Sequence, residues 1–228
     1  MPDKKKKVYL YRIMDFCRVV QIFESKALYF AHPSTWDDPF ETRVKHQSSH
    51  AMFAQCWSRI AASDAIWRIY SPNHMGVRIS TTENQIKAAI KESLNELGYS
   101  MTGRSVVYLR QSDLDVQVTD IARNLDREFN INQATEILYL KREAFSHEAE
   151  WRLTIYCHDF DNKEAKDGVL IKIDPYSLIN RILFDPRAPD ELVNAFTHYF
   201  KDVLKFKGKI GRSVLYKSPK RISLVDSN

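Results

Sequence analysis

The sequence predicts an α+β protein with a mixed or split β-sheet flanked by helices. Short runs of alternating or continuous apolar residues, typical of strands, recur along the whole chain. Longer segments with apolar residues at helical spacing interrupt these runs, and the longest lie in the middle of the chain. Because helices and strands do not alternate strictly, a doubly wound parallel sheet fits the pattern less well.

The sequence pattern of the first half of the chain predicts five strands and three helices. A first helix follows the first strand, because Phe16, Val19, Val20 and Phe23 fall at helical spacing. A short second helix starts after Ser63, a residue type that caps helices. The third helix, from Ile86 to Leu97, ends at Gly98. We expect the strands at residues 7–13, 27–33, 52–58, 76–80 and 106–109.

The second half begins with helices and continues mainly with strands. Apolar residues predict a long helix over 114–129, and the run INQATEILYLKR (131–142) is expected to continue as another. The last helix is expected over 192–203. We expect the remaining strands at residues 151–156, 168–173, 180–184 and 213–218.

The composition indicates a single folded domain spanning residues 1–228. The chain is 44% hydrophobic and 28% charged, as in ordinary globular proteins, and no Pro/Gly/Ser-rich linker divides it. Only six glycines occur, and neither GxGxxG nor GxxxxGK is present, so a glycine-rich phosphate loop is not expected.

The net charge of +5 is distributed unevenly. A basic N-terminal tail (residues 1–7) and a basic C-terminal segment (residues 201–221) enclose a slightly acidic middle. Such basic ends can contact nucleic acid, so a nucleic-acid-binding or protein-interaction module is one alternative function. Solvated lysines are the more ordinary interpretation of the same runs.

Cysteine usage and hydropathy favour a cytoplasmic protein. Three widely spaced cysteines without a CxxC pair argue against a disulfide framework and a cysteine-rich zinc site. No apolar stretch approaches the roughly 18 residues of a membrane span. The apolar run after the basic N-terminus is broken by charges, which argues against a secretory signal.

The stretch SHEAEWRLTIY (146–156) combines an apolar and a charged face. In an extended chain Ala149, Trp151, Leu153 and Ile155 share one face, and Glu148, Glu150 and Arg152 share the other. The apolar face is expected to be buried and the charged face to line a cleft. A simpler interpretation makes Glu150 and Arg152 a surface ion pair worth about 0–1 kcal/mol.

The stretch WDDPFE (36–41) has a structural and a chemical interpretation. Asp38 can cap a helix that starts at Pro39, with Glu41 completing a capping box. Alternatively, Asp37, Asp38 and Glu41 are metal ligands of a nuclease-like hydrolase, although our main interpretation expects no metal.

Several blocks together resemble a known family. They resemble the bacterial family called Domain of Unknown Function 2971, and the DDPFE and EAEWR blocks are the most specific. One departure is Asp37, where Asn is common in the family. The resemblance implies no activity. The blocks are YLYR (9–12), LYFAHPSTWDDPFE (28–41), CWS (56–58), WRIYSPNHMGVRI (67–79), HEAEWRL (147–153) and ILFDP (182–186).

The order of three motifs also resembles the arginine–serine–glutamate class of ADP-ribosyltransferases. An Arg on the first strand, a Ser ending a middle strand and Glu-x-Glu before a late strand follow that order. The resemblance implies that Arg12 and Ser58 help to hold NAD, Glu150 stabilises the sugar cation and Glu148 recruits the acceptor. The middle motif departs from the class, since CWS replaces Ser-Thr-Ser.

The side chains suit NAD chemistry. A partly desolvated carboxylate stabilises positive charge on a ribose, and Arg can bind a diphosphate. Tyr11, Trp67 and Tyr70 can stack on nicotinamide or adenine. We therefore expect an ADP-ribosyltransferase-like enzyme that cleaves NAD and modifies a macromolecule, in a toxin or defence role. The three hypotheses differ in which cluster lines the deepest cavity.

Overall fold

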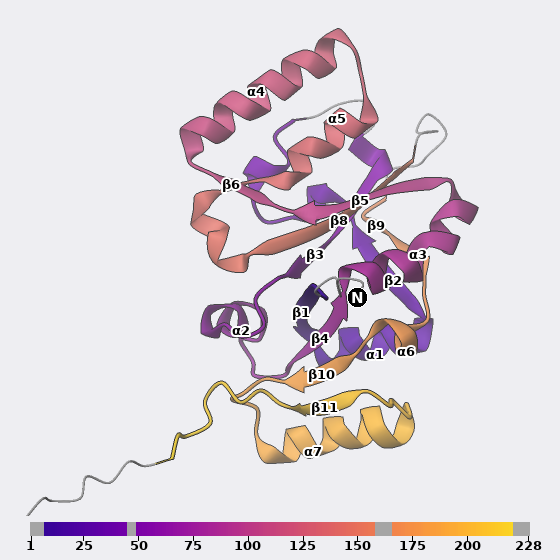
Figure 1. Ribbon diagram of the computed structural model, residues 1–228, viewed down its shortest axis with the longest axis vertical. Coiled ribbons are helices and arrows are strands. Elements are labelled where there is room, and N and C mark those ends of the chain that lie inside the picture. Colours follow the sequence, from indigo (N-terminus) through magenta and orange to yellow (C-terminus); the bar gives the residue numbers. More distant parts are fainter. Residues whose placement is uncertain (1–6, 45–48, 158–165, 221–228) are drawn as a thin grey trace, which may run out of the picture.

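The computed structural model describes residues 7–44, 49–157 and 166–220. It confirms the predicted class: a mixed β-sheet is flanked by helices, and a small parallel sheet lies beside it (Figure 1). Residues 1–6 of the predicted basic tail, and Arg221 of the basic C-terminal segment, lie outside the described residues.

The main sheet contains nine strands. Seven of them follow the order β11-β10-β4-β1-β3-β2-β9, while β8 pairs with both β3 and β5. Only β10 and β11 are parallel neighbours in this sheet; the other pairs are antiparallel. The strands are β1 (Tyr9–Asp15), β2 (Ala27–Ala31), β3 (Met52–Ser58), β4 (Gly76–Thr82), β5 (Tyr99–Ser105), β8 (Glu150–Cys157), β9 (Gly168–Lys172), β10 (Arg181–Phe184) and β11 (Lys209–Arg212).

The sheet splits around β3. This strand contacts β1 at only one pair, Tyr11 with Ser58, and β2 at only one pair, Ala31 with Ala54. It pairs with β8 over its whole length, up to Ser58 with Glu150. Strands β1 and β2 therefore both diverge from β3, one on each side of it. The end of β3 lies between β1 and the start of β8.

Helices cover both parts of the sheet. In Figure 1, α4 and α5 lie beside the β6–β7 sheet at one end of the molecule, and α7 covers β10 and β11 at the other. The predicted caps of α2 and α3 are confirmed: Ser63 accepts from the Ile66 N–H at 3.3 Å, and Gly98 ends α3 with φ 71°. The helices are α1 (Phe16–Ser25), α2 (Asp64–Tyr70), α3 (Glu83–Leu97), α4 (Gln111–Arg127), α5 (Ile131–Glu136), α6 (Pro175–Leu178) and α7 (Asp190–His198), and the small sheet pairs β6 (Val107–Leu109) with β7 (Leu140–Arg142). No helix among these is both long and apolar enough to cross a bilayer.

Strand β8 is buried on both faces. The predicted burial of Trp151, Leu153 and Ile155 is confirmed, since all three are 0% exposed. The other face is buried as well, with Glu150 at 4% and Arg152 at 1% exposure. The interpretation of Glu150 and Arg152 as a surface ion pair is therefore wrong. Alternation alone could not reveal that β8 lies between two covering layers.

The structure differs from the predicted secondary structure in three places. Residues 99–105 form β5, which we did not predict because its polar sequence YSMTGRS has no apolar stripe. The expected helix over 131–142 stops at α5, and Leu140–Arg142 form a strand. The expected strand at 213–218 is absent, because the polar segment Lys209–Arg212 pairs with β10 instead.

Trp151 holds β8 against β5. A Cβ atom built on Gly103 would lie 2.7 Å from the Trp151 ring, so the missing side chain makes room for the indole. We expect Trp151→Ala to lower the free energy of unfolding by about 3–5 kcal/mol. Leu170→Ala, at a side chain that is 58% exposed, should change it by less than about 0.5 kcal/mol. Urea denaturation of both variants checks this, and equal stability would contradict the assigned packing.

Candidate functional site

One cavity of about 490 Å³ collects all the predicted site residues. It lies where the end of β3 meets β1, α2 and the start of β8. The structure thus brings together side chains that are up to about 140 positions apart in the sequence. The predicted residues in its wall are Tyr11, Arg12, Ser58, Trp67, Tyr70, Glu148 and Glu150.

The strand pairing explains this convergence. Ser58 pairs with Tyr11 of β1 on one side and with Glu150 of β8 on the other. Residues directly opposite in antiparallel strands place their side chains on the same face. Helix α2 packs against β1 and adds Trp67 and Tyr70 to the wall. The first strand, the CWS block and the EAEWR block therefore meet at one point.

The two glutamates do not belong to one continuous strand. Glu148 ends a 3₁₀ helix (Glu143–Glu148), and β8 begins only at Glu150. Ala149 between them has φ 42°, a left-handed conformation that is uncommon for a residue with a Cβ. Our assumption that Ala149 continues the strand is wrong. Both carboxylates still line the cavity, and the Tyr108 hydroxyl accepts the Glu150 N–H at 2.8 Å.

Arg152 is the centre of a buried ion-pair network. Its guanidinium binds both oxygens of Glu150, at 2.8 and 2.9 Å, and reaches Glu41 at 3.0 Å. It also donates to the Leu138 carbonyl and lies 4.2 Å from the centre of the Trp36 ring. The network therefore joins the WDDPFE and EAEWR blocks, which the family resemblance marked as most specific.

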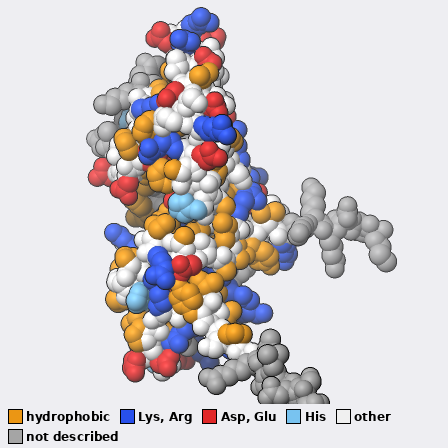
Figure 2. All heavy atoms as spheres, turned by 90° about the vertical axis from the view of Figure 1, so that its left-hand side faces the viewer, with side chains coloured by type: hydrophobic (Ala, Val, Ile, Leu, Met, Phe, Trp, Pro, Cys, Tyr) orange, Lys and Arg blue, Asp and Glu red, His pale blue; other side chains and the backbone are white. Residues whose placement is uncertain are grey.

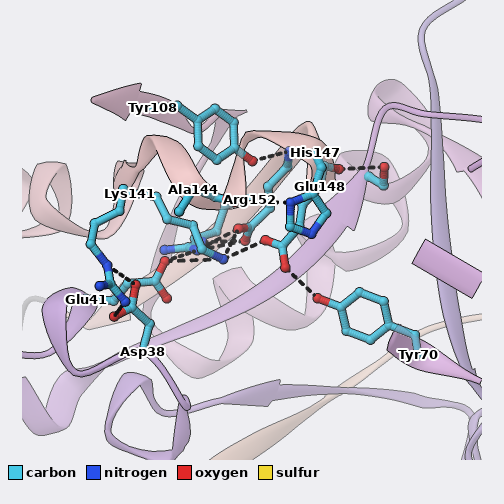
Figure 3. Close-up of polar contacts among 12 residues, drawn as sticks. Asp38, Glu41, Tyr70, Tyr108, Lys141, Ala144, His147, Glu148 and Arg152 are labelled. Atoms are coloured by element: carbon cyan, nitrogen blue, oxygen red, sulfur yellow. Dashed lines mark hydrogen bonds and ion pairs between the residues drawn. The ribbon is translucent and has the colours of Figure 1, made fainter. Parts of the chain in front are cut away.

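Lys141 extends the network to the open side of the cavity. Its ammonium lies 2.6 Å from Glu148, 3.2 Å from Glu150 and 3.6 Å from Glu41. The other oxygen of Glu148 accepts a hydrogen bond from the Tyr70 hydroxyl at 2.9 Å (Figure 3). Glu148 is thus fixed between α2 and β7.

The electrostatics keep Glu150 ionised. Burial opposes its negative charge, but Arg152 and Lys141 outweigh burial and lower the pKa of Glu150 below 4.5. At Glu41 burial is the stronger effect, so the pKa of that carboxyl is raised. Burial and the nearby Glu150 also raise the pKa of Cys56, whose thiol hydrogen-bonds to the Glu150 carboxylate. Glu150 therefore provides a fixed negative charge, while Cys56 remains a neutral thiol.

The predicted cofactor-binding residues differ in what they offer a ligand. The Ser58 hydroxyl is already used, because it donates to the Glu148 carbonyl at 2.7 Å and accepts from the Ile60 N–H at 3.0 Å. Trp67 is only 1% exposed and behaves mainly as a core residue. Arg12 is half-buried and forms no salt bridge among the described residues.

The structural interpretation of WDDPFE is correct in part. Asp38 caps the 3₁₀ helix Pro39–Glu41 by accepting from the Phe40 N–H at 3.1 Å. Glu41 does not complete a capping box, because its side chain turns to Arg152. Asp38 also pairs with Arg142 at 2.9 Å. Two of the three side chains proposed as metal ligands thus already have cationic partners, and the described residues contain no other cluster suited to a metal.

Sequence reasoning did not single out several residues of the cavity wall, among them Trp36, Cys56, Arg78 and Lys141. Lys141 falls in the run that predicted a helix, so its side chain had no expected direction. Arg78 could have been noticed as a charge inside the apolar strand GVRIS, the same signal that drew attention to Arg12.

None of the described residues of the basic C-terminal segment lines this cavity. Tyr216 of the segment hydrogen-bonds to Asp64 and Arg68 of α2, the helix that contributes to the cavity wall. The face shown in Figure 2 intersperses basic side chains with acidic and hydrophobic ones instead of gathering them into one block. Nucleic-acid binding through this segment stays a prediction.

A comparison with family models finds a match within the chain. Protein of unknown function (DUF2971) matches residues 66–153. The predicted resemblance to this family is confirmed for this region, which runs from α2 to the middle of β8. The DDPFE block lies outside the match. No curated protein matches the chain.

Solved structures that are similar to this chain come from Thermus sp. 2.9. "DarT in complex with NAD+" has a TM-score of 0.41 and 11% identity, covering 92% of this chain and 98% of that one. "DarT in complex with ADP-ribosylated ssDNA" has a TM-score of 0.43 and 9% identity, covering 91% and 95%. Similarity at this level leaves the function to be argued from the cavity.

Replacing Arg152, the centre of the network, should strongly lower the free energy of unfolding. Arg152→Met leaves the buried Glu41 and Glu150 without their guanidinium partner, and breaking a buried pair in this way costs about 3–5 kcal/mol. Arg104→Met removes an exposed ion pair with Glu136 and should cost less than about 1 kcal/mol. Denaturant unfolding measures both. Similar values for the two variants would contradict the central role of Arg152.

Proposed function

We propose that this protein cleaves the nicotinamide–ribose bond of NAD and transfers ADP-ribose to a macromolecule. The observation that carries the proposal is that one nucleotide-sized cavity holds an ionised, enclosed carboxylate and a guanidinium that forms no salt bridge among the described residues. The carboxylate is Glu150 and the guanidinium is Arg12.

Glu150 has the properties that the bond cleavage requires. Departure of nicotinamide leaves positive charge on the ribose, as in glycoside hydrolysis. A fixed negative charge stabilises such a transition state more strongly in an enclosed site than in water. Arg152 and Lys141 hold the Glu150 carboxylate in place, so little reorganisation is needed when the charge develops.

The rest of the cavity suits the other parts of NAD. Arg12 can pair with the diphosphate, since it makes no salt bridge within the described chain. The exposed ring of Tyr70 offers a stacking surface for a base. Ser58 acts by holding the backbone at Glu148, which shapes the site and leaves ligand contacts to its neighbours.

Glu148 remains our predicted contact for the acceptor. Its side chain is 13% exposed, more than that of Glu150, and it lies beside Tyr70. Replacing Glu148 should therefore impair transfer to the acceptor more than hydrolysis of NAD. A toxin or defence role in a bacterial cytoplasm remains an expectation from the resemblance in motif order.

Replacement of Glu150 tests the proposal. Glu150→Gln keeps the shape of the side chain but removes the charge, and we expect nicotinamide release from NAD to fall by about 10²–10³-fold. Glu41→Gln is the matched control, because it makes the same chemical change on another carboxylate bound to Arg152. Both variants should melt below the wild type, and only Glu150→Gln should lose most of its rate per folded molecule. Equal loss in both variants, or no release by the wild type, would contradict the proposal.

The pH dependence of nicotinamide release gives a second test. Arg152 and Lys141 lower the pKa of Glu150 below 4.5 in spite of its burial, so the carboxylate stays ionised throughout the neutral range. We therefore expect kcat/KM to show no protonation of this group between about pH 8 and pH 5. An acid limb centred near pH 6 or 7 that Glu150→Gln abolishes would contradict the assigned role.

A further inference from the structure

Arg78 of β4 is a buried arginine that pairs with no carboxylate in the part of the chain that the structure describes. The residue is 7% exposed, and its Nε atom is enclosed without a hydrogen-bond partner. None of the ion pairs among the described residues includes it. Its defined contact is the ring of Tyr11, whose centre lies 4.9 Å from Cζ.

Two other arginines show how unusual this is. The buried Arg152 has two carboxylates and a carbonyl, and even Arg187, which is only partly buried, has Asp185 at 2.8 Å. Removing a guanidinium from water is costly unless partners replace its hydration. Burial accordingly lowers the pKa of Arg78, and the nearby charge of Arg181 lowers it further, although Tyr11 acts in the opposite direction. Among the described residues, no carboxylate forms an ion pair with this charge.

Arg78 lies in the wall of the candidate cavity. On the β1–β4 ladder it is directly opposite Ile13, next to Tyr11 and Arg12, and all four residues line that cavity. The stacked Tyr11 ring limits the orientations of the guanidinium. The cavity thus has two ends. Near β8 lie carboxylates already neutralised by Lys141 and Arg152, and near β1 and β4 lie two arginines that form no salt bridge with any described residue.

We propose that Arg78, together with Arg12, forms a binding site for the phosphate groups of a nucleotide. Two guanidinium groups suit a diphosphate, which carries at least two negative charges and accepts paired N–H donors. The anion would supply the partner that Arg78 lacks. That the anion belongs to NAD rests on the proposed function; the phosphate site itself does not. It would orient the ligand with its phosphates toward β4 and its reacting ribose toward Glu150.

Binding of inorganic pyrophosphate tests the site directly. Titration calorimetry at constant ionic strength should show binding by the wild type. Arg78→Met should weaken the affinity by about ten- to a hundredfold, which is the usual effect of losing a hydrogen bond to a charged group. Arg181→Met is the matched control, since it removes a neighbouring charge on an exposed side chain and should leave the affinity within about twofold. Equal affinity of Arg78→Met and wild type, or no binding by the wild type, would overturn the proposal.

Thermal unfolding separates binding from a structural role. A long apolar side chain removes an unpaired buried charge, so Arg78→Met should melt at or above the wild-type temperature without ligand. At the same concentration, pyrophosphate should raise the melting temperature of the wild type more than that of the variant. Should Arg78→Met fail to fold, Arg78→Lys keeps the charge and should show weakened but measurable binding. A lower melting temperature with unchanged pyrophosphate affinity would assign Arg78 a purely structural role.

The same variants keep this proposal distinct from the enzymatic one. If pyrophosphate binds through Arg78 while the wild type releases no nicotinamide from NAD, the phosphate site stands and the proposed activity fails. If Arg78→Met cleaves NAD with unchanged KM and kcat, the activity stands and the assignment of this site to the phosphates of NAD is refuted.

Discussion

The enclosed guanidinium of Arg152 is the interaction on which the rest of the cavity depends. It joins three distant parts of the chain: Glu41 after β2, Leu138 before β7, and Glu150 at the start of β8. A buried arginine needs these partners, and the partners need the arginine, because each is enclosed. The position of Glu150 in the cavity is therefore a consequence of satisfying Arg152.

The split of the sheet provides the second constraint. Since β3 meets β1 at a single residue pair, the sheet opens next to Ser58, and side chains of β1 reach the same space as those of β8. A continuous ladder between β1 and β3 would fill that space with paired backbone. The cavity thus combines a negative charge held by cations on one side with arginines that lack such partners on the other. This polarity matches a ligand that develops positive charge at one end and carries phosphates at the other.

Much of the fold followed from local patterns, whereas the network did not. The helix at Asp64–Tyr70 and the strand Met52–Ser58 agree with their predicted limits, because a cap and an apolar run mark them in the sequence. The strand at Tyr99–Ser105 has no such mark, since its pairing with β8 is a tertiary effect. Motif order brought Arg12, Ser58 and Glu150 together correctly in space, although their roles stay predictions. Lys141 and Arg78 were not predicted as site residues. The direction in which a charged side chain points from a short strand depends on the neighbouring elements, which the sequence does not place.

The most direct test of this account is a crystal structure of the protein with NAD or a non-cleavable analogue. Catalysis requires near contact, so the anomeric carbon of the nicotinamide ribose should lie within about 3–3.5 Å of a Glu150 carboxylate oxygen. The diphosphate should lie on Arg12 and Arg78, with the network around Arg152 unchanged. A ligand bound in the reverse orientation or outside this cavity, or a cavity that remains empty at millimolar NAD, would contradict the account.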